Sequence, residues 1–221
     1  MDYLGLALYA EGPTDYSFLC PLLARLCEDL CTRDAAHPVE VSEVLRLDHP
    51  RAADEASRAE RIVLAGREAS DAWRILFIHA DGAGDPESKR REQAQPAIDR
   101  LYQEHAETRL GVAVVPVRET EAWAIVDGDA LRSVFGTSMT DQALGLPSTA
   151  GVTEGTPDPK ALLNTAFNAT HPSGQRRRRG VSPMLNALGE QVSLPRLREL
   201  AAFALLENEL RQALRRLSIV K

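Results

Sequence analysis

The sequence lacks a long hydrophobic run and an excess of positive charge. No stretch of about 18 consecutive apolar residues occurs, so we expect no membrane-spanning helix. Lysine and arginine number 26 against 32 aspartate and glutamate residues, and the formal net charge is −6. This balance excludes a uniformly basic surface of the kind that binds nucleic acid, but it does not exclude a local basic patch. The N-terminus has no basic segment and carries Glu11 where a signal peptide stays apolar, so we expect a cytoplasmic protein.

Cysteines are few, and all of them lie in one apolar segment. Cys20, Cys27 and Cys31 follow one another at spacings of seven and four residues, which places them near one face of a helix. A structural metal site needs four ligands and usually contains a tight Cys-x-x-Cys pair. We therefore expect buried, reduced thiols rather than a metal site.

Patterns typical of strands and helices alternate through the first 130 residues. We predict strands over residues 3–10, 39–47, 73–80 and 111–117, and helices over 14–31, 51–72, 87–108 and from about residue 119. Pro21 predicts a kink or a restart inside the first helix. This alternation predicts an α/β fold of the Rossmann-like kind, a mainly parallel sheet with helices on both faces.

Beyond about residue 130 the strand patterns vanish and short helical patterns remain. They cover residues 140–146, 158–169, 182–190 and 194–217, separated by connections rich in glycine, proline and threonine. We predict an α/β core over residues 1–130 and a helical C-terminal extension over residues 131–221 packed on it, with a soft boundary near 130–157.

The stretch HPSGQRRRRG, residues 171–180, contains the densest positive charge and predicts an arginine-rich loop. Planar guanidinium groups bind phosphates well, so Arg176, Arg177, Arg178 and Arg179 are candidates for contact with a DNA or RNA backbone. No motif for reading bases accompanies them, so we expect little sequence specificity. The alternative is a solvated loop without a ligand.

Acidic residues follow the predicted strands at the point where each strand ends. Glu11 follows the first strand, Asp81 and Asp85 follow the third, and Glu119 and Glu121 follow the fourth. In an open parallel sheet these ends share one edge, and ligands bind outside it. Converging carboxylates repel unless a cation lies among them, and Mg²⁺ prefers such oxygen ligands. Alternatively, each acid is only a turn former or a residue that favours a helix start.

The same stretches resemble a known fold. AEGPTDYSFL and FIHADGAGD are similar to the two motifs of the TOPRIM domain, the Mg²⁺-binding fold of topoisomerases, primases and OLD-family nucleases. With VPVRETEAWAIVD and the later DPK, they resemble a bacterial family of TOPRIM-like proteins related to OLD-family nucleases, over roughly residues 5–160. Members of that family are often encoded beside ABC-type ATPases in phage-defence loci.

The resemblance implies roles for particular residues. Glu11 would be the general acid/base or a metal ligand, and Asp81 the first metal-binding aspartate. The usual second aspartate position holds Ala83, and Asp85 is the candidate that replaces it. Lys160 would balance charge on the scissile phosphate or the leaving oxygen.

The last motif supplies one further acid. Residues 119 and 121 lie about 200° apart on a helix, so both face a metal only if one precedes the helix. Glu121 is favoured over Glu119 as the ligand or catalytic acid. Trp123 is interpreted as a core residue, and His79 as a satisfied core histidine, the alternative being a residue that orients a metal ligand.

Taken together, the motifs predict a nuclease that depends on Mg²⁺ or Mn²⁺ and cleaves DNA or RNA. The resemblance further implies a separate ABC- or OLD-type ATPase partner and a role in antiviral defence; the chain itself has no Walker-A motif. Two alternatives stay open: another metal-dependent phosphoryl-transfer enzyme, and a non-catalytic Mg²⁺-binding regulatory module. The sequence indicates no oligomeric state.

Overall fold

The structure, a computed structural model, describes residues 2–50, 56–69 and 71–221. Its centre is a four-stranded sheet, all parallel, with the strand order β2-β1-β3-β4. The strands are β1 (Asp2–Tyr9), β2 (Val39–Arg46), β3 (Ile75–His79) and β4 (Leu110–Val114). The predicted α/β class is therefore confirmed, and the four predicted strands fall within one to three residues of the observed ones.

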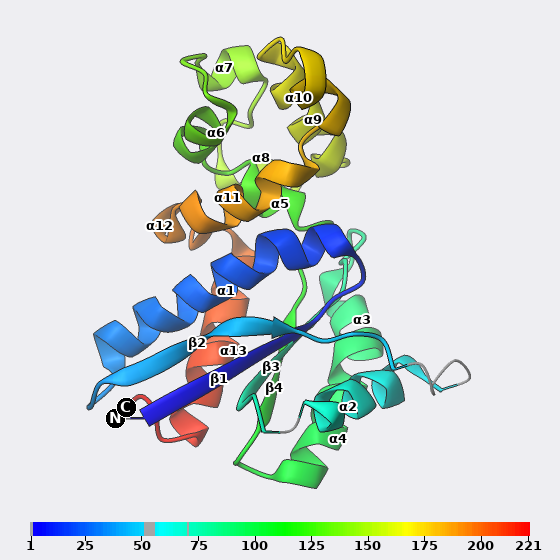
Figure 1. Ribbon diagram of the computed structural model, residues 1–221, viewed down its shortest axis with the longest axis vertical. Coiled ribbons are helices and arrows are strands. Elements are labelled where there is room, and N and C mark those ends of the chain that lie inside the picture. Colours follow the sequence, from blue (N-terminus) through cyan, green and yellow to red (C-terminus); the bar gives the residue numbers. More distant parts are fainter. Residues whose placement is uncertain (1, 51–55, 70) are drawn as a thin grey trace.

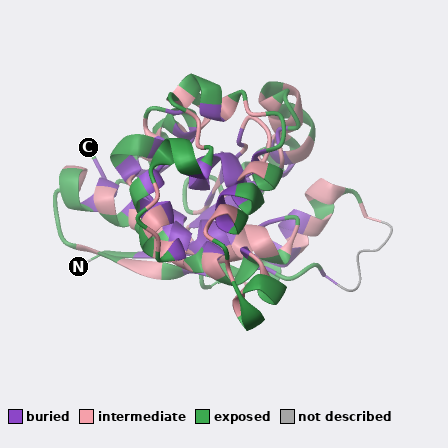
Figure 2. Ribbon diagram, turned by 90° about the horizontal axis from the view of Figure 1, so that it is seen from above, coloured by how far each residue is buried: buried purple, intermediate pink, exposed green. Residues whose placement is uncertain are grey.

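Side chains alternate between the two faces of the sheet, as the period of a strand requires. On β1, Leu6 and Leu8 belong to the larger hydrophobic cluster with α1 (Pro13–Asp34) and α13 (Ala201–Arg216). Ala7 and Tyr9 belong to a second cluster with α2 (Arg58–Glu68) and α4 (Gln95–His105). Both faces are thus covered by helices, as a buried parallel sheet requires, and buried residues concentrate at the centre of the molecule in Figure 2.

The helices of the first half largely follow the prediction. Helix α1 runs through Pro21 without a restart, and its cysteines are buried and unpaired. Of the helix predicted over residues 51–72, α2 is observed, while residues 51–55 and 70 lie outside the described part. The helix predicted over 87–108 is a continuous run of α3 (Pro86–Lys89), the π-helical turn η2 (Arg90–Ala94) and α4.

Short helices build a cap beyond the carboxyl edge of the sheet, the helical cap (residues 121–197). It contains α5 (Glu121–Ala124), α6 (Gly128–Phe135), α7 (Asp141–Leu144), α8 (Ala150–Glu154), α9 (Pro159–Ala169), α10 (Gly174–Arg179), η3 (Ser182–Met184), α11 (Leu185–Gln191) and α12 (Leu194–Leu197). Figure 1 shows these helices stacked beyond α1, with α13 returning to the sheet. No strand belongs to this region, as predicted.

The helical cap and the sheet share one core. Residues of β1, α1, α9 and α11 belong to the same hydrophobic cluster, so the cap has no separate interior. Trp123 of α5 is fully buried, as predicted, and its ring meets Phe203 of α13 edge-to-face at 5.3 Å between centroids. Such a pair adds about 0.5–1.5 kcal/mol beyond its buried area. This contact fixes α5 against the helix that packs on β4.

The described helices include none that is long and apolar enough to cross a membrane.

Candidate metal site at the carboxyl edge of the sheet

The acids predicted to converge lie at one edge of the sheet. Glu11 follows β1, Asp81 follows β3, and Glu121 opens α5 after β4. Because the strands are parallel, all three segments leave the sheet at its carboxyl edge. Five polar or charged residues are buried among the described residues, and three of them, His79, Thr120 and Glu121, lie at this edge. Buried polar groups are costly without partners, so their concentration here indicates a site rather than packing.

The loop after β3 is held against the loop after β4. A Cβ on Gly82 would lie 2.0 Å from the carbonyl oxygen of Pro116, so only glycine permits this approach. Ala83 and Gly84 follow with φ of 50° and 91°, and the N–H of Gly84 donates to the carbonyl of Val117 at 2.8 Å. The acids of the two loops are consequently held at a fixed separation.

His79, the last residue of β3, lies at the centre of the acidic edge. Its side chain is fully buried, with Nε2 3.4 Å from Asp81 Oδ1 and Nδ1 3.9 Å from Asp15 Oδ2. Neither ring nitrogen has a hydrogen-bond partner among the described residues, and neither has Asp81 Oδ1. The interpretation of His79 as a satisfied core histidine is therefore wrong.

Glu11 is tied to the same position through an arginine. Nη1 of Arg58 lies 3.3 Å from Glu11 Oε1, and its Nη2 donates to the carbonyl oxygen of His79 at 2.6 Å. The guanidinium also lies over the ring of Tyr9, at 5.8 Å from the centroid. Glu11 and Asp81 therefore lie on the same side of the molecule, joined through Arg58 and His79.

Asp15 brings the start of α1 to the start of α5. Its Oδ2 accepts the N–H of Gly12 at 3.0 Å in a capping box, and its Oδ1 accepts the hydroxyl of Thr120 at 3.3 Å. The same hydroxyl lies 3.4 Å from Glu121 Oε2. One shared hydroxyl thus lies between two carboxylates from segments more than a hundred residues apart.

Burial raises the pKa of Glu121, because its carboxylate has lost most of its water. Its own backbone N–H and the Lys160 ammonium lower that pKa, while the Glu119 and Asp15 carboxylates raise it. Glu119 Oε2 is buried without a hydrogen-bond partner among the described groups. Both acids of the ETEAW stretch consequently face the edge, and Lys160 is the cation that the helical cap supplies.

The donors at this edge fit a hard divalent cation. They are carboxylate oxygens, the ligands that Mg²⁺ prefers, and Asp81 Oδ1 and Glu119 Oε2 are buried with no partner among the described residues. Within those residues, no three His, Cys, Asp or Glu side chains are already gathered into a metal-binding group. Asp85 differs from the other predicted ligands, because it caps α3 by accepting the N–H of Ser88 at 3.0 Å.

The arginine-rich segment is a short helix, α10, and not the predicted loop. Arg176 points inward: its Nη2 donates to the carbonyl of Phe135 at 2.5 Å, and its guanidinium lies over the ring of Phe167 at 5.4 Å. Arg177, Arg178 and Arg179 are exposed. The segment thus divides into one arginine that packs and three that are free to meet a ligand from solvent.

Three residues of the site were missed by the sequence interpretation: Asp15, Arg58 and Thr120. Asp15 belongs to the quoted EGPTD stretch and lies in the first turn of α1, four residues after Glu11. Thr120 lies between the two acids of ETEAW. No sequence pattern marked Arg58 as a site residue, since it begins a helix that contains several other arginine and glutamate residues.

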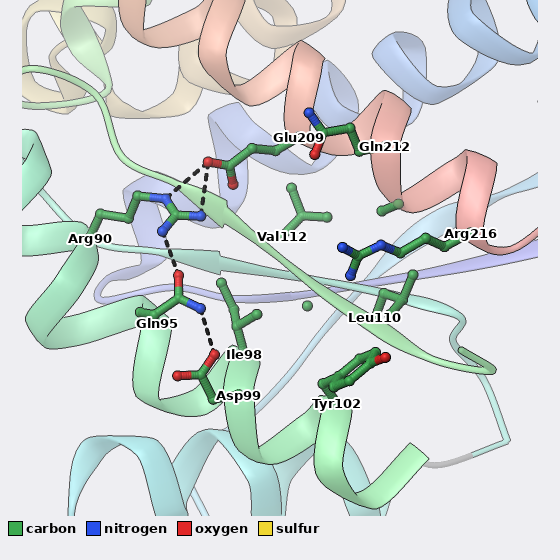
Figure 3. A pocket seen from close by; sticks show the side chains of 12 residues that line it. Arg90, Gln95, Ile98, Asp99, Tyr102, Leu110, Val112, Glu209, Gln212 and Arg216 are labelled. Atoms are coloured by element: carbon green, nitrogen blue, oxygen red, sulfur yellow. Dashed lines mark hydrogen bonds and ion pairs between the residues drawn. The ribbon is translucent and has the colours of Figure 1, made fainter. Parts of the chain in front are cut away.

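A separate hollow lies along β4, the edge strand, between α4 and α13. It has a volume of about 280 Å³ and contains none of the acids described above. Figure 3 shows a row of hydrogen-bonded side chains across it. Arg90 donates to both Glu209 and Gln95, and Gln95 donates to Asp99. These hydrogen bonds pair Arg90 with Glu209 and join α13 to α4. The hollow is therefore not a competing candidate for metal chemistry.

The model of a protein family described as a domain of unknown function, DUF4276, matches residues 10–211. The chain therefore belongs to that family, and the match includes every residue of the acidic edge and of α10. No curated protein and no solved structure matches the chain.

Proposed function

For this member of the DUF4276 family, we propose that the acidic edge binds Mg²⁺ or Mn²⁺ and that the protein is a TOPRIM-type nuclease that hydrolyses phosphodiester bonds of DNA or RNA. The observation that carries the proposal is the gathering of acids from three separate segments, with buried carboxylate oxygens on Asp81 and Glu119 that lack partners among the described residues. Such oxygens are costly in a metal-free interior and are satisfied by a hard cation.

The role proposed for each residue follows from its position at the edge. Glu11, Asp15, Asp81 and Glu121 would hold the cation, with Glu119 beside them and Asp85 at the rim. A bound divalent cation polarises the phosphodiester and lowers the pKa of a bound water. The carboxylate of Glu11 would be the proton acceptor, since 38% of its side chain is exposed and a water can reach it from solvent.

Positive charge of the helical cap would bind the substrate. Lys160 opens α9 near Glu121, where its ammonium would meet a phosphate oxygen. Arg177–Arg179 belong to α10, which follows the C-terminal end of α9, an 11-residue helix that is about 16 Å long at 1.5 Å per residue. Contacts at both places suit an extended nucleic acid and not a mononucleotide.

The wider setting is proposed on the resemblance of the motifs alone. We place the protein in the cytoplasm, acting with a separate ABC- or OLD-type ATPase in antiphage defence. A regulatory Mg²⁺-binding module is the second candidate, favoured by the ion pair between Arg58 and Glu11, which already neutralises the acid proposed as proton acceptor.

The test compares the wild type with Glu11→Gln and Asp81→Asn, using plasmid, single-stranded DNA and RNA with Mg²⁺ or Mn²⁺. Glu40→Gln is the matched control, because Glu40 is an exposed acid near the opposite end of the sheet. We expect cutting to fall at least about 100-fold in the two site variants, the scale of general acid–base catalysis, and to persist in the control. Cutting that persists in all three refutes the assignment, whereas metal binding without any cutting favours the regulatory module.

A further inference from the structure

His79 is buried in a way that packing alone does not explain. It ends a strand whose other residues, Ile75 to Ile78, are all apolar and buried, and its own side chain is fully buried. Both ring nitrogens lack hydrogen-bond partners among the described residues. A buried polar atom left in this state costs about 1–3 kcal/mol, so an apolar residue would serve the core better.

The ring lies between two carboxylates that come from different elements. Asp15 belongs to the first turn of α1 and Asp81 to the loop after β3, and the two ring nitrogens face one carboxylate each, at 3.9 and 3.4 Å. These distances exceed a hydrogen bond, as polar contacts of an active site often do before a ligand binds. A shift of less than 1 Å would bring either contact within range.

The backbone of the same residue reaches the third acid. The carbonyl oxygen of His79 accepts Nη2 of Arg58 at 2.6 Å, while Nη1 of Arg58 pairs with Glu11. His79 is therefore the residue that connects the acids following β1 to the acid following β3.

We propose that His79 is a positioning residue, which orients the Asp81 carboxylate through the adjacent Nε2, so that Asp81 and the other acids of this edge bind a divalent cation together. This inference rests on the proposed metal site. It assigns to His79 the task that hydrogen-bonded partners of metal ligands perform elsewhere, where their loss costs about 10–100-fold in metal affinity. His79 itself does not touch the cation in this arrangement.

The test measures Mn²⁺ affinity by electron paramagnetic resonance, with Mn²⁺ as the sole ligand and the full chain in every case. We expect His79→Leu to bind Mn²⁺ about 10–100-fold more weakly, and His79→Gln to fall between it and the wild type, because the amide can still donate to one carboxylate. His105→Gln is the control and should bind as the wild type does, since His105 lies against Trp73 on the α2 and α4 face. Circular dichroism checks that each variant is folded.

A double-mutant cycle separates positioning from a merely structural role. If His79 acts through Asp81, then adding His79→Gln to Asp81→Asn should weaken Mn²⁺ binding by no more than about twofold beyond Asp81→Asn alone. Additive losses, or wild-type affinity in both His79 variants, overturn the inference while leaving the metal site in place. A wild type that binds no Mn²⁺ overturns the metal site itself, and the inference with it. If His79→Leu does not fold, the Gln variant and the cycle still decide.

Discussion

Replacing Gly82 with alanine should separate the two loops that carry the acids. The new Cβ would lie 2.0 Å from the carbonyl oxygen of Pro116 and 2.6 Å from that of Val117, and both obstacles are backbone atoms. Neither can move aside as the end of a side chain could. The loop after β3 must therefore retreat by about 1 Å to restore normal contact, and it takes Asp81 with it.

The size of the effect follows from these overlaps. Overpacking a well-filled interior costs typically about 1–3 kcal/mol, and two backbone obstacles place Gly82→Ala at about 3 kcal/mol. The retreat also stretches the bond from the N–H of Gly84 to the carbonyl of Val117, now 2.8 Å. For a chain of this length, such a loss lowers the melting temperature by about 6–12 °C.

The assay combines urea unfolding with Mn²⁺ titration and uses two matched glycines. In Gly5→Ala the added Cβ would lie 2.3 Å from the carbonyl oxygen of Ala72, far from the acids. This variant should lose comparable stability without losing Mn²⁺ affinity. Gly151 lies in α8 with nothing within 4 Å of an added Cβ, so Gly151→Ala should be neutral or gain up to about 1 kcal/mol. The reasoning is refuted if Gly82→Ala is as stable as Gly151→Ala, or if it keeps wild-type Mn²⁺ affinity despite its lost stability.

Two further predictions concern charge. Changing Arg177–Arg179 together to glutamine should weaken DNA or RNA binding in 50 mM salt and reduce the slope of log affinity against log salt by about two to three, measured by fluorescence anisotropy; an unchanged slope would exclude these side chains as phosphate contacts. Burial lowers the pKa of His105 from 6.5, as do Arg109 and Arg67, while Glu104 opposes them. Because the folded-state pKa is the lower one, His105 contributes stability above pH 6.5 that is lost as the pH falls through the folded-state pKa. His105→Gln should therefore lose less stability than the wild type between pH 7 and pH 5, and an equal loss in urea unfolding would contradict this.

The strands were predictable because burial on both faces leaves a strong pattern. Residues 73–80 read as a near-continuous apolar run, which is typical of a strand inside a parallel sheet, and β3 is such a strand. The short helices α6, α8 and α10 were not predicted, and α8 lies in a connection rich in glycine, proline and threonine that masks its helical pattern. The arginine run was interpreted as a loop from its Gly, Ser and Pro neighbours, which in fact flank the two ends of α10.

The site was predictable where it depends on topology and unpredictable where it depends on side-chain contacts. Parallel strands place Glu11, Asp81 and Glu121 at one edge whatever the details of the loops. Asp15 could not be separated from an ordinary helix-capping acid, because it performs that task as well, accepting the N–H of Gly12. The part played by Arg58 depends on how α2 packs on the sheet, and no local pattern encodes that packing.

Charge balance is the strongest physical argument that the edge is made for a cation. Three cations of the protein accompany five carboxylates in the described structure. Arg58 and Lys160 lie near Glu11 and Glu121, and the guanidinium of Arg118 lies against Gly84 in the loop after β3. The carboxylates are those of Glu11, Asp15, Asp81, Glu119 and Glu121. Arg58 is engaged by Glu11, and Lys160 is exposed, so its charge is screened by water. Burial and the neighbouring acids therefore leave Glu121 with a raised pKa. A single divalent cation would reverse that shift, because it would favour the ionised form of every acid it contacts.

Mg²⁺ should accordingly stabilise the wild type against thermal unfolding, as a ligand of the folded state does, and should not stabilise Asp81→Asn to the same extent. Equal stabilisation of the two proteins by Mg²⁺ would show that the cation binds elsewhere.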